Sequence, residues 1–430
     1  MPMSLPRALR PFETRQYRLL ALALLMSLLG SGIWAVAMVW QVMELGGGPR
    51  QLSSVATAGA LGLMAAVLLG GVTADRVPQR RVLMLVELTK SLVVGTGAVL
   101  ALTGNLQVPH MVAIALVLGL ADAFFYPAYT AMLPGILPPD QLLAANGVEG
   151  VLRPTIQQAA GPALAGLVIA SFSPAHGMAL VAVLQVLAMV GLSRLKPVAL
   201  RRELDAGQNP LLGALDDVRS GFKYMVGTPW LLATLLMATL MLLLIMGPIQ
   251  VLMPFAIRER MGGDAGGFAL ALAAFGIGGA VGSIGIASWR LPRRYLTAML
   301  LMWGVSCLPL VVVGFATKLW IVVPALFVSG ALGGMANVIW GTLLQRRVPP
   351  ELLGRVSSLD FFVSLALMPV SMAIAGPLGE RLGLPLMFGV AAFVPPLLAV
   401  VALLLARLPR DEIEHPLDQG ADAPTLQDEA

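Results

Sequence analysis

The chain has 430 residues, of which 58% are hydrophobic and only 12% are charged. A soluble domain usually carries about 25% charged residues because its surface faces water. The composition therefore excludes a soluble enzyme and indicates a chain that lies mostly in lipid. The net charge of +5 comes from short Lys and Arg clusters between apolar runs, which is typical of membrane anchors and not of a nucleic-acid-binding surface. The single cysteine, Cys307, excludes an intramolecular disulfide and any CxxC-type metal or redox motif.

Twelve apolar segments are long enough to be transmembrane helices, which need about 20 largely apolar residues each. The first segment follows several arginines and is too long for the apolar core of a signal peptide. We therefore expect an all-α membrane protein with twelve transmembrane helices. The predicted helices cover residues 17–44, 51–74, 82–104, 109–134, 147–172, 176–195, 229–257, 266–288, 295–316, 318–345, 356–380 and 384–407.

The distribution of basic residues predicts the orientation of these helices. With both termini in the cytoplasm, most of the 28 Lys and Arg residues fall in cytoplasmic segments. The five that would lie outside are Arg50, Arg258, Arg260, Lys318 and Arg381. By the positive-inside rule, we expect a multi-pass protein of the cell (inner) membrane with both termini cytoplasmic.

The longest connection, residues 196–228, separates an N-terminal half (1–195) from a C-terminal half (229–410) of six helices each. Within the connection, Asn209-Pro210 is a typical helix start, and apolar residues follow it at helical spacing. This pattern predicts a cytoplasmic linker with an amphipathic helix on the inner leaflet. Residues 411–430 are rich in acidic residues and lack basic ones, so we expect a disordered acidic tail.

Three short motifs recur in the same order in the two halves. The segment that starts at Gly71 matches the one that starts at Gly285, and Pro138-Pro139-Asp140 matches Pro349-Pro350-Glu351. Ala160-Gly161-Pro162 likewise matches Ala375-Gly376-Pro377. Two related six-helix halves predict a binding site at their interface near the bilayer midplane, with alternating access.

The loop after the second predicted helix resembles the signature Gly-x-x-x-Asp-Arg-x-Gly-Arg-Arg of the major facilitator superfamily. Gly71, Asp75, Arg76 and Arg80 match this pattern, whereas Pro78 and Gln79 depart from it. The resemblance extends over nearly the whole chain and implies the fold of that superfamily.

In the superfamily this loop stabilises the outward-facing state through a contact of its acidic residue with the start of helix 11. Carried over, Asp75 would face Ser357 and Ser358, where free helix N-terminal amides would favour a carboxylate. A basic loop that only fixes the membrane topology is the alternative.

Two further stretches resemble exporters. Gly161-Pro162-Ala163-Leu164-Ala165-Gly166 is similar to the antiporter motif of drug exporters, although Ala165 replaces a glycine and close helix packing explains the segment as well. The stretch that begins Phe12-x-x-x-Gln16-Tyr17 resembles the branch that holds enterobactin exporters and macrolide efflux pumps.

In this superfamily, helices 1, 4, 7 and 10 line the cavity, so their polar, aromatic and methionine residues are candidates for substrate contacts. Asp122 is the most specific, because an ionised carboxylate halfway along a transmembrane helix costs roughly 2.5–3.5 kcal/mol. The candidate cavity residues are Ser31, Trp34, Met38, Gln41, Asp122, Tyr126, Tyr129, Met241, Gln250, Asn337 and Trp340. Helix packing is the alternative for each Met and Trp.

Carboxyl groups inside the membrane are candidates for proton coupling, namely Asp122 first and Asp360 second. Burial favours the neutral form of a carboxyl group, so we expect Asp122 to be protonated or neutralised by substrate. Two pairs of oppositely charged residues, each three or four positions apart on one helix, are expected to form ion pairs or gates. These pairs are Glu149 with Arg153 and Glu87 with Lys90.

Enzyme and cofactor motifs are absent from the sequence. Gly276-x-Gly278-x-x-x-Gly282 lacks the spacing of a dinucleotide-binding loop. His110 and His176 lie at the outer surface and His415 in the tail, so no histidine inside the membrane could serve a metal site or a hydrolase. We therefore expect a secondary transporter that needs no cofactor or metal and is not an enzyme.

The expected function is proton-coupled efflux of amphipathic small molecules such as drugs, macrolides or siderophore-like compounds. Its partners would be the substrate, protons and membrane lipid, with no nucleic acid, and the chain would act as a monomer. The alternatives are a lipid or lysolipid translocase, an uptake permease of the same fold, and a transporter-like sensor or scaffold.

Overall fold

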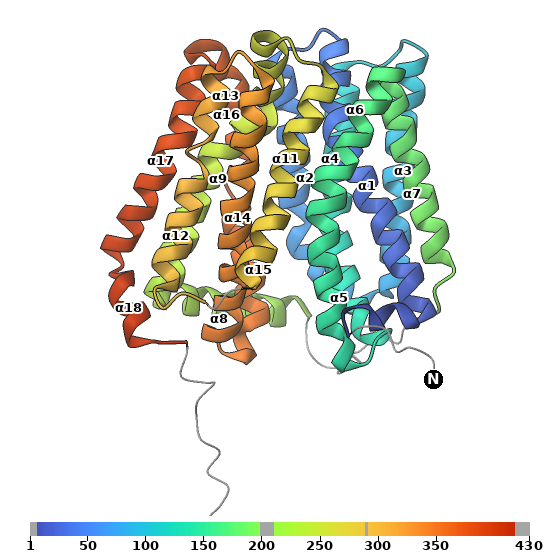
Figure 1. The fold of residues 1–430 in the computed structure, drawn as a ribbon. Helices are drawn as coiled ribbons and strands as arrows, with labels where there is room; N and C mark the ends of the chain where they lie inside the picture. Colours follow the sequence, from blue (N-terminus) through green and yellow to red (C-terminus); the bar gives the residue numbers. More distant parts are fainter. Residues whose placement is uncertain (1–6, 198–209, 289–290, 418–430) are drawn as a thin grey trace, which may run out of the picture.

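The structure is a computed structural model that describes residues 7–197, 210–288 and 291–417. Ten helical segments in this part of the chain are long and apolar enough to cross a membrane. Helix α2 and a rod of three consecutive helical pieces, α5, η3 and α6 (residues 139–171), supply the other two of the twelve predicted crossings (Figure 1). The regular structure of the described residues is helical throughout, as the composition predicts.

The N-terminal half starts with a short 3-10 helix, η1 (Arg7–Glu13), and contains a π-helical piece in its fifth rod. Its crossings are α1 (Arg15–Glu44), α2 (Pro49–Arg76), α3 (Gln79–Leu102), α4 (Val108–Met132) with η2 (Leu133–Gly135), the rod α5 (Pro139–Leu152), η3 (Arg153–Ala160) and α6 (Gly161–Ser171), and α7 (Pro174–Ser193).

The C-terminal half follows α8 (Pro210–Gly227). Its crossings are the rod α9 (Pro229–Gly247), η4 (Pro248–Leu252), α10 (Met253–Phe255) and η5 (Ala256–Arg260), then α11 (Ala265–Ala287), α12 (Tyr295–Ser306) with α13 (Leu310–Phe315), α14 (Leu319–Arg347), α15 (Pro350–Leu365) with α16 (Met368–Leu382), and α17 (Leu384–Leu405). A last helix, α18 (Leu408–Glu414), ends the described chain.

Proline and glycine set many of the helix ends. Proline stands at the start of α2, α7, α9 and α15, where a missing backbone N–H does no harm. Gly104 and Gly383 take positive φ angles of 75° and 80° in the turns after α3 and α16, a conformation that glycine adopts without a steric penalty.

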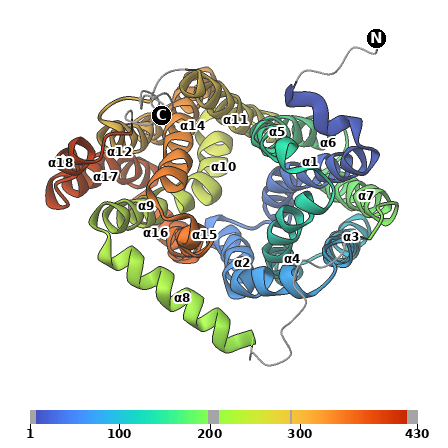
Figure 2. The same cartoon turned by 90° about the horizontal axis from the view of Figure 1, so that it is seen from below.

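The two halves pack in equivalent ways, as the repeated motifs predict. Helix α4 packs along α2, and α14 packs along α11, the corresponding pair of the second half. Between the halves, α2 packs on α16 and α11 packs on α6 and η3, which are again equivalent contacts (Figure 2). The backbones come close at Gly119 and Gly330, where a Cβ atom would collide with a carbonyl oxygen of the neighbouring helix. Small residues thus allow the same close crossing twice.

Helix α8, the start of α1 and α18 lie at one end of the bundle, which we call the terminal face (bottom of Figure 1). The halves contact each other at the opposite face. There, Arg50 Nε lies 2.5 Å from Glu380 Oε2, and the amide of Gly376 donates to Ser53 Oγ at 2.8 Å. The rings of Trp40 and Phe268 stack with centroids 5.5 Å apart.

The C-terminal tail differs from the prediction of disorder from residue 411. Asp411 to Glu414 belong to α18, and Asp411 forms a salt bridge with Arg347. The carboxylate of Glu412, whose residue is 1% exposed, accepts the backbone N–H groups of Leu296 and Thr297. The capping of α12 by Glu412 and the salt bridge of Asp411 with Arg347 explain the order. Residues 418–430 lie outside the described part.

Helix 11 also begins earlier than predicted. Its first piece, α15, starts at Pro350 and not near residue 356, because proline is a favourable first residue of a helix. The amides of Ser357 and Ser358 therefore lie in the helix interior and are not free to bind a carboxylate. The prediction that these two amides are free is therefore wrong. The side chain of Asp75 lies outside the described residues, so its own contacts stay untested. Asn209 and the side chains of residues 211–218 in the predicted amphipathic helix also lie outside it.

Candidate transport site

Asp122 stands about halfway along α4 and pairs with a lysine of α3. Its carboxylate forms a salt bridge with Lys90 Nζ. The side chain of Asp122 is 49% exposed, whereas that of Lys90 is 3% exposed. The ammonium group also lies 5.2 Å from the centroid of the Phe125 ring, a cation–π contact. Lys90 is thus a buried cation behind an accessible carboxylate.

Glu87 lies one turn before Lys90 on α3 and is fully buried, with 0% exposure. Its Oε1 accepts a hydrogen bond of 2.7 Å from the hydroxyl of Ser27 on α1. Its Oε2 has no hydrogen-bond partner among the described residues. The salt bridge of Lys90 is with Asp122 of α4, and Glu87 interacts with the same lysine without a salt bridge. The predicted pair is thus part of a cluster of three charged residues.

Two further charged side chains contact Tyr126, which lies one turn after Asp122 on α4. The Tyr126 hydroxyl donates to Glu149 Oε1 of α5, and the guanidinium carbon of Arg153 lies 3.7 Å from the centroid of the Tyr126 ring. The predicted ion pair of Glu149 and Arg153 is not among the described salt bridges. Both side chains contact Tyr126 instead, since Arg153 begins a π-helical turn and turns its guanidinium onto the ring.

Three of the predicted cavity residues on α1 are partly exposed, namely Ser31, Trp34 and Met38. Gln41 is instead 3% exposed and donates to Glu44 Oε2 at 3.4 Å. Gln41 is therefore packed between helices and does not line an open surface in this conformation, which corrects the prediction that it lines the cavity.

Tyr129 and Met241 are corrected in the same way, with exposures of 1% and 7%. The Tyr129 ring stacks on Phe125 at a centroid distance of 6.4 Å, because its face of α4 turns into the core of the N-terminal half. Met241 belongs to a large apolar core. Gln250 is exposed, with its Nε2 atom 3.6 Å from the sulfur of Met246.

The corresponding region of the C-terminal half is aromatic. The indole N–H of Trp340 donates to Asp360 Oδ2 at 3.1 Å, and Ser364 Oγ donates to the other carboxylate oxygen at 3.2 Å. The indole N–H of Trp303 donates to Asn337 Oδ1 at 3.1 Å. Both oxygens of Asp360 thus have donors, in contrast to Glu87.

Two tryptophans of this cluster were not among the predicted residues. The rings of Trp230 and Trp303 lie 6.2 Å and 6.0 Å from Trp340, measured between centroids, and Arg347 stacks 4.6 Å over Trp230. A sequence signal existed, because four of the seven tryptophans fall in helices of the C-terminal half. Their convergence depends on helix packing and was not visible in the sequence.

The predicted conformational motifs also have structural roles. Arg80 Nε donates to the carbonyl oxygen of Leu192 at 3.1 Å, at the end of α7, where a cation is favourable. A Cβ atom at Gly161 would lie 2.8 Å from Cα of Gly32, so Gly161-Pro162 lets α6 approach α1. Gly71 has open space around such a Cβ atom, and Arg76 lies in the last turn of α2.

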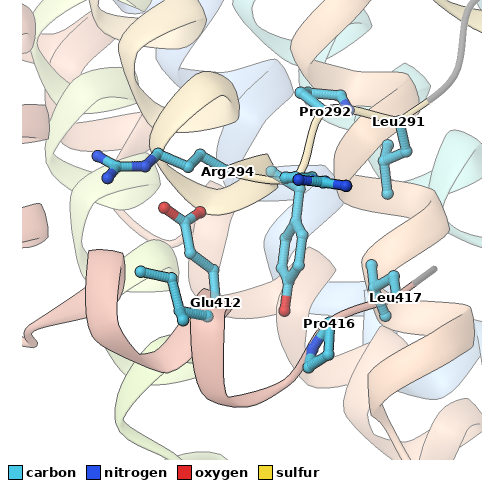
Figure 3. A pocket seen from close by; sticks show the side chains of 9 residues that line it. Leu291, Pro292, Arg294, Glu412, Pro416 and Leu417 are labelled. Carbon is cyan, nitrogen blue, oxygen red and sulfur yellow. The ribbon is translucent and has the colours of Figure 1, made fainter. Parts of the chain in front are cut away.

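A cavity of about 430 Å³ lies at the terminal face. Figure 3 shows that it lies between the segment before α12, which contributes Leu291, Pro292 and Arg294, and the end of α18, which contributes Glu412. It includes none of the residues predicted to contact substrate.

Comparisons with known proteins agree with this architecture. The sequence profile of a family described as transmembrane secretion effector matches residues 7–428. The chain is 30% identical to the multidrug efflux pump Tap of Mycolicibacterium fortuitum over 396 residues, which cover 88% of this chain and 93% of the pump. It is 26% identical to the enterobactin exporter EntS of Citrobacter koseri over 417 residues, which cover 94% and 95% of the two chains.

Among solved structures, a mutant of the nucleoside transporter NupG is similar, with a TM-score of 0.71 and 11% sequence identity. The match covers 91% of this chain and 99% of NupG, and it shows a common fold. The twelve crossings, the two equivalent halves and the family match lead to one assignment. The chain belongs to the transmembrane secretion effector family of the major facilitator superfamily and is a membrane transporter, not an enzyme.

Proposed function

We propose that this protein is a proton-coupled exporter of amphipathic small molecules. The observation that carries the proposal is the half-exposed carboxylate of Asp122 in the middle of α4, paired with the buried Lys90. A charged group at this depth is costly unless it is paired or has a function. Its exposure leaves it able to exchange the lysine for a cationic substrate.

The composition of the two clusters supports this substrate class. Partly exposed Trp34, Met38 and Trp340 offer apolar and aromatic surface, and methionine adapts to ligands of different shape. Phosphorylated substrates would need several basic groups, and sugars would need many hydrogen-bonding groups. Similarity to a multidrug efflux pump and an enterobactin exporter supports export over uptake.

Alternating access is proposed as the transport cycle. The halves contact each other at the opposite face through Arg50 and Glu380. If both termini are cytoplasmic, as the basic residues predict, this arrangement is the inward-facing state of a monomer in the cell (inner) membrane. Asp360 is the second proposed coupling carboxylate, although its oxygens already accept two hydrogen bonds.

The test is transport in proteoliposomes with an imposed pH gradient. The compounds are a cationic dye, a macrolide, a catecholate siderophore and a fluorescent lysolipid. We expect gradient-driven movement of at least one of the first three, and a fall to the rate of protein-free liposomes in Asp122→Asn. The matched control is Asp264→Asn, because Asp264 caps α11 through Gly267 and asparagine caps helices equally well.

Each result has a distinct meaning. Normal gradient-driven transport by Asp122→Asn would contradict the role of Asp122. Movement of the lysolipid alone, without dependence on the gradient, would favour a lipid translocase. No movement of any compound would favour a sensor or scaffold.

A further inference from the structure

Glu87 is the buried carboxyl group for which the proposed function has no role so far. The residue has no exposed surface, and one of its two oxygens lacks a hydrogen-bond partner in the described structure. A charged oxygen without a donor is far more costly in a low-dielectric interior than a neutral carboxyl group. The geometry therefore favours a protonated Glu87 in this conformation.

Few charged groups lie on the helices around Glu87. Helix α4 contributes Asp122, and Lys90 lies on α3 itself. Helix α1 contributes the Ser27 hydroxyl but carries charges only at its ends, as does α2. Helix α7 has one titratable group in its span, His176 in its first turn. Beyond Asp122, the fifth rod adds Arg153 and Glu149.

The charges of this cluster balance only if one acid is neutral. The acids are Glu87, Asp122 and Glu149, and the bases are Lys90 and Arg153. Glu149 is partly exposed and accepts the Tyr126 hydroxyl, and Asp122 has a salt bridge. Glu87 is the acid with neither exposed surface nor a salt bridge, and one of its oxygens has no donor, so its carboxyl group is the most costly of the three to ionise.

We infer that Glu87 is the proton-binding site of this transporter, and that Lys90 moves from Asp122 to Glu87 when a cationic substrate binds. This inference rests on the proposed function and assigns its proton to a residue other than Asp122. Residues three apart on a helix are neighbours on one face, so Lys90 reaches either carboxylate by a change of side-chain rotamer.

The exchange is balanced in charge. Before binding, Asp122 is negative, Lys90 is positive and Glu87 is neutral. The substrate cation takes the place of Lys90 at Asp122, the ammonium turns to Glu87, and the Glu87 proton leaves to water. The three side chains and the cation again sum to zero. When the cation leaves on the other side, a proton returns to Glu87 and Lys90 returns to Asp122.

The first test needs no substrate. Infrared spectra of the purified full-length protein in lipid show the carbonyl stretch of protonated carboxyl groups. We expect this band to contain a component at neutral pH that is lost in Glu87→Gln and retained in Glu13→Gln, since Glu13 is an exposed residue of η1. An unchanged band in Glu87→Gln would overturn the inference.

The second test measures proton release in weakly buffered solution when tetraphenylphosphonium, a lipophilic cation, is added. We expect about one proton per bound cation in the unmodified protein. Glu87→Gln should bind the cation without release, and Asp122→Asn should lose the binding. Release by Glu87→Gln at the normal level would overturn the inference.

The conservative variant Glu87→Asp is the control for the case in which Glu87→Gln fails to fold. It keeps a carboxyl group and should retain proton release, with a shifted pH dependence because the Ser27 hydrogen bond is lengthened. Loss of release in a folded Glu87→Asp would also count against the inference. Absence of all flux in the proteoliposome panel would refute the proposed function, while the infrared band would still decide the protonation of Glu87.

Discussion

At the scale of single residues, the main feature is one buried cation with two carboxylates within reach. Lys90 is 3% exposed, and an unpaired ammonium in such a place is strongly destabilising. Asp122 neutralises it in this conformation, and Glu87 is a neighbour on the same helix face. A lysine with two possible partners tolerates the loss of either one but not of both.

This redundancy predicts non-additive stability. Asp122→Asn and Glu87→Gln should each lower the melting temperature slightly, and the double variant should lose far more than the sum. Removing the last partner of a buried charge costs about 3–5 kcal/mol, whereas independent sites add. Thermal unfolding in detergent is the measurement. Adding Lys90→Gln to the double variant should restore most of the loss, and simple additivity would argue against a shared lysine.

At the scale of elements, the helices were predictable because a long apolar run has few alternatives in lipid. Their breaks and ends were not. The π-helical turn η3 follows from Pro154 and Pro162 together with the packing of α1 on Gly161, a contact between distant segments. Composition alone predicted disorder from residue 411, yet Glu412 is ordered because the start of α12 offers free amides.

Helix α18 should therefore act as a cap for α12. Glu412→Ala removes the acceptor of two backbone N–H groups and of the Thr297 hydroxyl, and we expect a loss of about 0.5–2 kcal/mol in stability. Hydrogen–deuterium exchange should rise in α18 and in the first turn of α12. The matched control is Glu414→Ala, an exposed residue of the same helix. Equal exchange in the two variants would contradict the capping role.

At the scale of the whole molecule, the repeated motifs predicted two equivalent halves, and the packing of α2 on α4 and of α11 on α14 agrees with them. The site was predictable in part. Asp122 and Asp360 stand out as charges in apolar helices, whereas their partners Lys90 and Trp340 come from other helices. Pairing across helices depends on rotation about each helix axis, which a single sequence does not specify.

The contacts at the opposite face predict how the conformational equilibrium responds to mutation. The Arg50–Glu380 salt bridge joins the halves, but its side chains are 56% and 32% exposed, so its contribution is about 0.2–1 kcal/mol. Arg50→Ala should therefore increase the population with the halves apart by at most about fivefold. The reporter is Ser53→Cys in a Cys307→Ser background, because Ser53 is 3% exposed at this contact.

A membrane-impermeant maleimide should label this cysteine faster, within the same fivefold limit, in Arg50→Ala than in the parent. The reversed pair Arg50→Glu with Glu380→Arg should return the rate toward the parent value, because it restores the opposite charges. A change in labelling that persists in the reversed pair would mean that the side chains act through packing and not through their charges. Unchanged labelling in Arg50→Ala would show that the other contacts between the halves, such as the stacking of Trp40 on Phe268, are enough to hold this face closed.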